Sequence, residues 1–362
     1  MNQHSDIDRV LSRWFDDGPA TMPDRVVGVV AGRIGRQPQR RGWRLFWRQH
    51  PMNGYTKLIA AAVAGLALVL VGSVALPRLL DQVGRARPFG EIIARYDNVT
   101  LGLVHPVDLA VAPNGDIYVT ESNDRVTEIT PSGRIVRQWG MPGSAPGQFD
   151  FNGLQAANGA YASIAVAPDG RVYVADSDNH RVQVFEADGT FVRQFGSAGS
   201  GQGQFGLAYD LAVDASGNAY VLDDMLEHLT KFSPTGEVIW IANRSTNPAL
   251  VGHGHGVTLD PRGRLVYGND DNGKVIYLDT NGRFLDAFDA GACDVSVDGA
   301  GNAYVGGCAS PDIKVFDPAH TLTGTWTGAL LRDAPAFGPA GEVFGFDRDG
   351  NMVRIQFNLT AG

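Results

Sequence analysis

Several signatures are missing from this chain, and each absence removes a class of function. The 362 residues contain no Gly-Lys-Ser/Thr phosphate loop, no Gly-x-Ser-x-Gly elbow and no His-Glu-x-x-His pair. The common motifs of nucleotide binding, serine hydrolysis and zinc proteolysis are therefore not present. Cysteine is also scarce, since Cys293 and Cys308 are the only two, and metal ligation there would need more Cys or His beside them.

Positive charge is scarce beyond the first quarter of the chain. Residues 1–88 contain 13 Lys and Arg against 6 Asp, a net charge of +7. Residues 89–362 hold the remaining 17 basic and 33 acidic residues, a net charge of −16. A region this acidic repels phosphate backbones, so nucleic acid is not an expected partner.

Only one hydrophobic run is long enough to cross a membrane. Residues 58–76 carry no charge, and Ser73 is their only polar side chain. At about 1.5 Å per residue, a helix of this length approaches the thickness of a bilayer core. The preceding residues 40–57 place Trp43 and Trp47 among arginines, which suits an anionic membrane surface. We expect a single-pass transmembrane helix, with a buried globular helix as the alternative.

The flanking residues indicate an orientation in the cell membrane. The basic N-terminal region and the paired tryptophans favour a cytoplasmic N-terminus, with residues 77–88 linking to an extracytoplasmic domain at 89–362. Cleavage by signal peptidase near residues 73–75 is the alternative, but the apolar run is long and starts late for a signal peptide. Residues 1–39 predict two short helices, which form either a hairpin for a cytoplasmic protein or a loosely ordered tail.

A repeat organises residues 89–362. Each copy has four short alternating apolar runs, too short for helices, which predict a four-stranded antiparallel meander. Each copy has one apolar residue in its first strand that serves as a marker. A glycine stands four residues after each marker, as a tight turn requires, and in most copies a bulky residue stands seven residues after it. Marker spacings of 38 to 55 residues are typical of propeller blades, so we predict an all-β fold, a six-bladed β-propeller. The markers are Val111, Val166, Val213, Leu259, Val297 and Phe337.

The two ends of the repeat region predict how the ring closes. The last copy ends after its third strand, residues 352–357, whereas residues 90–96 are similar to the fourth strand at 133–139. We expect residues 91–96 to form the outer strand of the last blade, because an unpaired third strand would leave an exposed edge.

The second copy resembles an NHL repeat. It reads DSDNHRVQVF at residues 176–185, and Gly-Gln-Phe triplets at 147–149 and 203–205 add to the resemblance. The resemblance covers residues 89–357, strongly in the first two copies and by spacing alone in the last. It implies a fold rather than an activity, because such propellers serve as sensors, adaptor surfaces, RNA binders and a few enzymes.

Acidic residues gather where first strands begin and second strands end, at the expected mouth of the central channel. One set stands three residues before the markers, and another, including Asp347, stands ten after them. These carboxylates form either a ring that binds Ca²⁺ or a basic ligand, or ordinary caps of the following turns. The predicted ligand-binding residues are Asp108, Glu121, Asp176, Asp210, Asp223, His255 and Asp294.

Histidines at the same mouth leave a metal-dependent enzyme as an alternative hypothesis for the function. His105, His253 and His255 precede first strands, and a peptidylglycine lyase of this fold uses zinc held by histidines near the axis. Three blades lack a histidine at the corresponding entry, so no set of metal ligands is assigned.

The favoured function is a binding or sensor scaffold for a protein, peptide or glycan, resembling the extracytoplasmic sensors of receptor kinases. The alternative is a metal-dependent hydrolase or lyase of the six-bladed lactonase or peptidylglycine-lyase kind.

The two cysteines bear on the compartment. Cys293 begins the first strand of the fifth copy and Cys308 ends its second strand, so the intervening turn would bring them nearly opposite each other. We expect a cross-strand disulfide in an oxidising compartment, with two buried thiols as the alternative.

Overall fold

The computed structural model of the chain describes residues 89–151, 161–248, 250, 253–292, 294–307, 310–327, 331 and 334–357. The expected membrane span, the regions flanking it and both cysteines lie outside these residues. Within them, no helix has the length and apolar character needed to cross a membrane.

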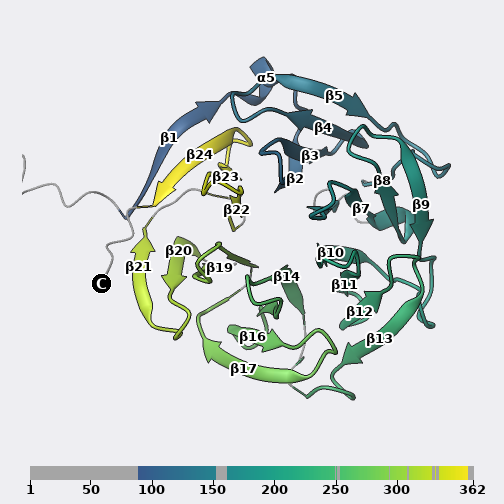
Figure 1. Ribbon diagram of the computed structural model, residues 1–362, viewed down its shortest axis with the longest axis vertical. Helices are drawn as coiled ribbons and strands as arrows, with labels where there is room; N and C mark the ends of the chain where they lie inside the picture. The colour runs from purple at the N-terminus through teal and green to yellow at the C-terminus, as the bar shows by residue number, and fades with distance from the viewer. Residues whose placement is uncertain are drawn as a thin grey trace, which may run out of the picture. The chain divides into compact units, whose positions relative to one another are not determined.

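The described strands form six four-stranded antiparallel sheets arranged as blades around a central axis (Figure 1). The six-bladed propeller predicted from the repeat is therefore confirmed. Blade 1 contains β2 (Pro106–Val111), β3 (Ile117–Glu121), β4 (Arg125–Ile129) and β5 (Ile135–Trp139). Blade 2 contains β6 (Ile164–Val166), β7 (Val172–Asp176), β8 (Arg181–Phe185) and β9 (Phe191–Phe195). Blade 3 contains β10 (Ala208–Val213), β11 (Ala219–Asp223), β12 (His228–Phe232) and β13 (Val238–Asn243).

The remaining blades follow in chain order. Blade 4 contains β14 (Gly254–Leu259), β15 (Leu265–Asn269), β16 (Lys274–Leu278) and β17 (Phe284–Asp289). Blade 5 contains β18 (Asp294–Val297), β19 (Ala303–Gly307), β20 (Ser310–Phe316) and β21 (Leu322–Trp326). Blade 6 contains β22 (Ala336–Phe337), β23 (Val343–Phe346), β24 (Met352–Phe357) and β1 (Gly90–Tyr96). Helix α5 (Asn98–Leu101) links β1 to blade 1, and the 3₁₀ turn η3 (Ser177–Asn179) links β7 to β8.

The ring closes between the two ends of the described chain, as predicted. Strand β1 pairs antiparallel with β24, from Gly90 opposite Phe357 to Tyr96 opposite Met352 (Figure 1). The N-terminal strand thus supplies the outer strand of blade 6, and the third strand of that blade is not left as an edge.

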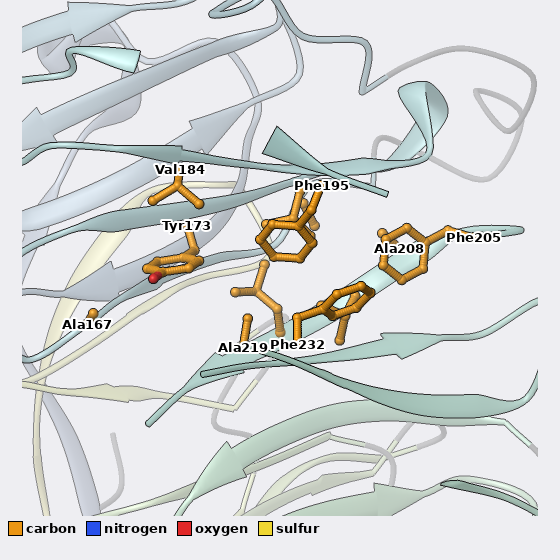
Figure 2. Packing of buried hydrophobic residues seen from close by; sticks show 12 residues of the cluster. Ala167, Tyr173, Val184, Phe195, Phe205, Ala208, Ala219 and Phe232 are labelled. Atoms are coloured by element: carbon orange, nitrogen blue, oxygen red, sulfur yellow. The ribbon is translucent and has the colours of Figure 1, made fainter. Parts of the chain in front are cut away.

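The core is a set of apolar layers between neighbouring blades. Between blades 2 and 3, one cluster contains Tyr173 and Phe195 of blade 2, Phe205 of the connection and Phe232 of blade 3 (Figure 2). The rings of Phe195 and Phe232 lie 4.6 Å apart between centroids. The bulky residues seven after the markers are all buried in such layers, which is why a single blade cannot stand alone.

A second contact between blades repeats at the outer turns. A glycine in the turn between third and fourth strands lies against the aromatic ring of the preceding blade: Gly133 on Tyr96, Gly189 on Trp139, Gly236 on Phe195 and Gly282 on Trp240. Each of these glycines has a positive φ, and a Cβ on Gly236 would lie 2.8 Å from Phe195. In blade 5, His320 occupies this place with φ 64°, and its ring stacks on Phe288 at 4.5 Å.

Candidate functional site at the propeller mouth

The registers place the predicted site residues on one face of the propeller. The start of each first strand pairs with the end of the second, as in Pro106 opposite Glu121 and Gly254 opposite Asn269. This face, the mouth, also carries the turns between second and third strands and the connections between blades.

The three aspartates near the starts of first strands join neighbouring blades. Oδ2 of Asp108 accepts a hydrogen bond from the backbone N–H of Ile164 in blade 2, at 2.9 Å. Oδ2 of Asp210 accepts one from Val257 in blade 4 at 2.7 Å, and Oδ2 of Asp294 accepts one from Ala334 at the entry to blade 6 at 2.6 Å. In each case, Oδ1 accepts the N–H of the residue that follows the aspartate. These carboxylates therefore connect blades 1 to 2, 3 to 4 and 5 to 6.

The equivalent positions of the other three blades carry small residues. Ser163 of blade 2 donates its hydroxyl to Oδ1 of Asp210 at 2.6 Å. A Cβ on Gly256 of blade 4 would lie 2.2 Å from Oδ1 of Asp294, so a side chain there would displace that carboxylate. The alternation of aspartate with a small residue thus follows from the close approach of one inner strand to the next.

The second group of carboxylates lies at the ends of second strands, where Glu121, Asp176 and Asp223 accept backbone N–H groups of the loops that enter their blades. Asp176 accepts hydrogen bonds from Nε of Arg181 at 2.7 Å and from the backbone N–H of Asp150 at 2.8 Å. Asp223 accepts the N–H of Gly206 at 2.7 Å. Glu121 is paired with Arg125 and Thr127, and Asp347 with Arg95 at 2.7 Å. All four, like Asn269 at the same place in blade 4, are at most 2% exposed.

Burial shifts the ionisation of two of these carboxylates, Asp176 and Asp223. Removal from water raises the pKa of the Asp176 carboxyl, while the N–H of Asp150 and the guanidinium of Arg181 act in the opposite direction. Burial likewise raises the pKa of Asp223 and lowers that of His228, which faces it across β11 and β12. Across the described residues, no three Asp, Glu or His side chains are grouped closely enough to hold a metal ion.

A row of aromatic rings crosses the mouth from blade 2 to blade 4. Tyr161 and Tyr209 lie 5.5 Å apart between ring centroids, and Tyr209 and His255 lie 5.1 Å apart. The hydroxyl of Tyr209 is 3.5 Å from Nδ1 of His255. All three side chains are partly exposed. We call Tyr161, Tyr209 and His255 the aromatic row.

Local bulges set the direction of two of these rings. The pairing of β10 with β11 shifts register between Ala208 and Asp210, and that of β14 with β15 shifts between Gly254 and Gly256. Tyr209 and His255 are the extra residues at these two shifts. A bulge redirects one side chain out of the regular alternation, and bulges occur often beside binding sites.

Carboxylates of the adjoining turns contact the histidines of this region. Nε2 of His255 is 3.5 Å from Oδ2 of Asp270. Nδ1 of His253 is 3.0 Å from Oδ1 of Asp224, and this hydrogen bond together with the negative charge of Asp224 raises the pKa of His253. The backbone N–H of His253 also donates to Asp271 at 3.3 Å.

The structure therefore separates the predicted site residues into two kinds. Asp108, Asp210 and Asp294 connect blades and Glu121, Asp176 and Asp223 hold entry loops, whereas His255 belongs to the exposed aromatic row. Sequence reasoning missed Tyr161, Tyr209 and Asp270. One signal was available for Tyr209, because it stands four residues before its marker, at the same offset as His255.

Comparisons with known proteins agree with this fold. Residues 162–185 match the NHL repeat. This NHL match lies in blade 2. None of the curated proteins matches the sequence. A streptogramin B lyase structure is similar at 13% identity and a TM-score of 0.53, covering 75% of this chain and 100% of that one.

Two structures of virginiamycin B lyase from Staphylococcus aureus are also similar. One is the selenomethionine-substituted protein and the other a catalytically inactive variant with quinupristin. Each has 12% identity and a TM-score of 0.51, covering 70% of this chain and 80% of the lyase. Similarity at this identity indicates a shared fold.

Proposed function

We propose that the chain is a membrane-anchored, extracytoplasmic NHL-type propeller whose mouth binds a protein, peptide or glycan. The aromatic row carries this proposal. Three neighbouring, partly exposed rings form an aromatic surface of the kind that dominates binding interfaces, where tyrosine contributes contact area at low entropic cost. Most of the other predicted mouth residues are engaged in holding the blades together, so the row offers the ligand surface.

The membrane anchor rests on the sequence of residues 40–76. The uncharged run at 58–76 follows a segment rich in Arg and Trp, and β1 begins about a dozen residues after it. A short link of this kind would keep the propeller close to the membrane surface, as suits a receptor for ligands outside the cell.

The binding proposal is tested on an array that carries both short peptides and oligosaccharides. The full chain in detergent is applied as wild type, as Tyr209→Ala and as Val107→Ala. Val107 is the matched control because it occupies the equivalent bulge of blade 1, where β2 shifts register between Pro106 and Asp108. We expect wild type and Val107→Ala to bind the same ligands and Tyr209→Ala to lose them. An array on which all three variants bind alike would contradict binding at this row.

A metal-dependent hydrolase or lyase is the second candidate. His255 lies between the Tyr209 hydroxyl and the Asp270 carboxylate at 3.5 Å from each, an arrangement that could orient an imidazole as a general base. The lyases named above share the fold. Incubating the full chain with quinupristin and Mg²⁺, Ca²⁺ or Zn²⁺ distinguishes the candidates. Cleavage of quinupristin that is lost in His255→Ala would favour the enzyme, and unchanged quinupristin would favour the scaffold.

A further inference from the structure

We infer that the mouth over blades 3 and 4 recognises a cationic group, namely the Lys or Arg side chain of a basic peptide segment; this inference rests on the proposed function and names its ligand class. The aromatic row supplies ring faces, and the turns beside it supply carboxylates. An ammonium or guanidinium group is attracted by both.

The faces of the three rings are the first feature that attracts a cation. An aromatic ring carries negative potential on its face, and a cation within about 6 Å of the ring centroid is attracted to it. Tyr161 and Tyr209 are inclined by 48° and Tyr209 and His255 by 45°, so neighbouring rings are tilted rather than stacked face to face. The three side chains are also partly exposed, so a ligand can reach them.

The carboxylates of the adjoining turns are the second feature that attracts a cation. Residues 224–227 read Asp-Met-Leu-Glu and residues 270–273 read Asp-Asp-Asn-Gly, with no Lys or Arg in either turn. Glu227, Asp270 and Asp271 are exposed, and Lys274 beyond them is already paired with Asp289 at 3.0 Å. The surroundings reinforce this local charge, because residues 89–362 have a net charge of −16. An acidic surface of this kind concentrates basic ligands and speeds their encounter.

The apolar surface between these charges favours a peptide side chain over a compact cation. Met225 is 58% exposed on the same turn as Asp224 and Glu227. A flexible, exposed thioether on this turn suits the aliphatic stem of Lys or Arg, whose charged end then reaches the carboxylates. A metal ion would gain nothing from such a surface.

The experiment measures binding of two fluorescein-labelled hexapeptides to the full chain in detergent. One alternates Lys and Gly, and the other is the same peptide with every lysine Nε-acetylated, which removes the charge but keeps the stem. We expect acetylation to weaken binding about tenfold or more, since both cation–π and Coulomb attraction are lost. Equal binding of the two peptides would overturn the cationic assignment while leaving peptide binding at the mouth intact.

Matched variants locate the site. Asp270→Asn with Asp271→Asn, and Tyr209→Leu, should each weaken binding of the lysine peptide several-fold, and Tyr209→Phe should keep it because the ring face is retained. The control pair Asp169→Asn with Glu186→Gln removes two carboxylates that are 53% and 49% exposed on the opposite face. If that control weakens binding as much, the attraction comes from net charge alone and the inference fails.

A chitosan trimer, which bears amines on a sugar, serves as the third probe. Binding of the trimer without binding of the lysine peptide would overturn the peptide assignment. Binding of none of the three probes would overturn the inference of a cationic ligand. The array described above still decides whether the mouth binds another ligand, so failure of this inference and failure of the proposed function are distinguishable.

Discussion

Asp210 of blade 3 accepts a hydrogen bond from the backbone N–H of Val257 in blade 4, with 2.7 Å between Oδ2 and the nitrogen. Its other oxygen accepts the N–H of Leu211 and the hydroxyl of Ser163 in blade 2. One carboxylate thus connects three blades at the mouth. The bond to the next blade recurs at Asp108 and Asp294, which makes these residues structural connections of the ring.

Replacing Asp210 should destabilise the whole propeller. Asp210→Ala leaves the N–H of Val257 without its acceptor in a partly buried place, at a cost of about 1–3 kcal/mol. Asp210→Asn should also be destabilising, because its amide nitrogen would face one of the backbone donors. Urea unfolding measures the effect, with Glu237→Ala, an exposed side chain of the same blade, as the control. A wild-type midpoint for Asp210→Ala would refute the role of this residue in joining blades.

Two turn glycines offer a matched pair of substitutions: Gly236 lies in the turn between the third and fourth strands of blade 3, and Gly263 in the turn between the first and second strands of blade 4. Gly236 and Gly263 both have positive φ, but a Cβ on Gly236 would contact Phe195 at 2.8 Å, whereas a Cβ on Gly263 meets nothing within 4 Å. Gly263→Ala should cost about 1–2 kcal/mol from backbone strain alone. Gly236→Ala should cost a further 1–3 kcal/mol, roughly, because the new Cβ would lie 2.8 Å from Cβ of Phe195 and 3.2 Å from its ring, so that side chain must move. Thermal unfolding compares them, and equal melting temperatures would rule out the close packing of blade 3 on blade 2.

Closure of the ring predicts a strong dependence on β1. A chain that begins at residue 89 retains the pairing of β1 with β24, and one that begins at residue 97 lacks it. The shorter chain exposes the third strand of blade 6 and the apolar layer that Ile92 covers, so it should melt at a lower temperature and aggregate more readily. Identical melting curves would contradict closure by this strand.

The contact between His253 and Asp224 predicts a measurable titration. Because the hydrogen bond and charge of Asp224 favour the imidazolium, the pKa of His253 should lie above 6.5 and return toward it in Asp224→Asn. A raised pKa in the folded state means that this contact stabilises the fold below about pH 6.5 and that its contribution is lost as the pH rises through the folded pKa. NMR titration of the imidazole measures it. A pKa that is the same in both proteins would show that the pair does not form.

The periodic pattern was sufficient for the architecture. Tight turns require glycine, buried second strands require bulky apolar residues, and both recur at the six markers, so the number of blades could be counted from the sequence. Closure was also predictable, because the last copy lacks a fourth strand and residues 90–96 carry the pattern of one. These features depend on residues that are close together in the chain, so they can be recognised in the sequence.

Contacts between blades could not be predicted in the same way. The sequence positions of Asp108 and Asp294 predict ligand-binding residues at the mouth. In the structure, however, their carboxylate oxygens accept backbone N–H groups 56 and 40 residues away in the chain. Sequence spacing does not reveal which backbone groups of a neighbouring blade face a carboxylate. That depends on the distance between adjacent inner strands, which only the closed ring sets.

The aromatic row shows the same division between sequence and tertiary structure. The sequence determined that Tyr209 and His255 stand four residues before their markers, but a regular strand would give no reason to expect their rings to touch. The register shifts in blades 3 and 4 place both residues at bulges, and the packing of consecutive blades brings Tyr161, Tyr209 and His255 together. The sequence alone was thus enough to predict which strand ends contribute residues to the mouth. Its surface was decided by tertiary structure, because residues from three blades meet only when the sheets are arranged around one axis.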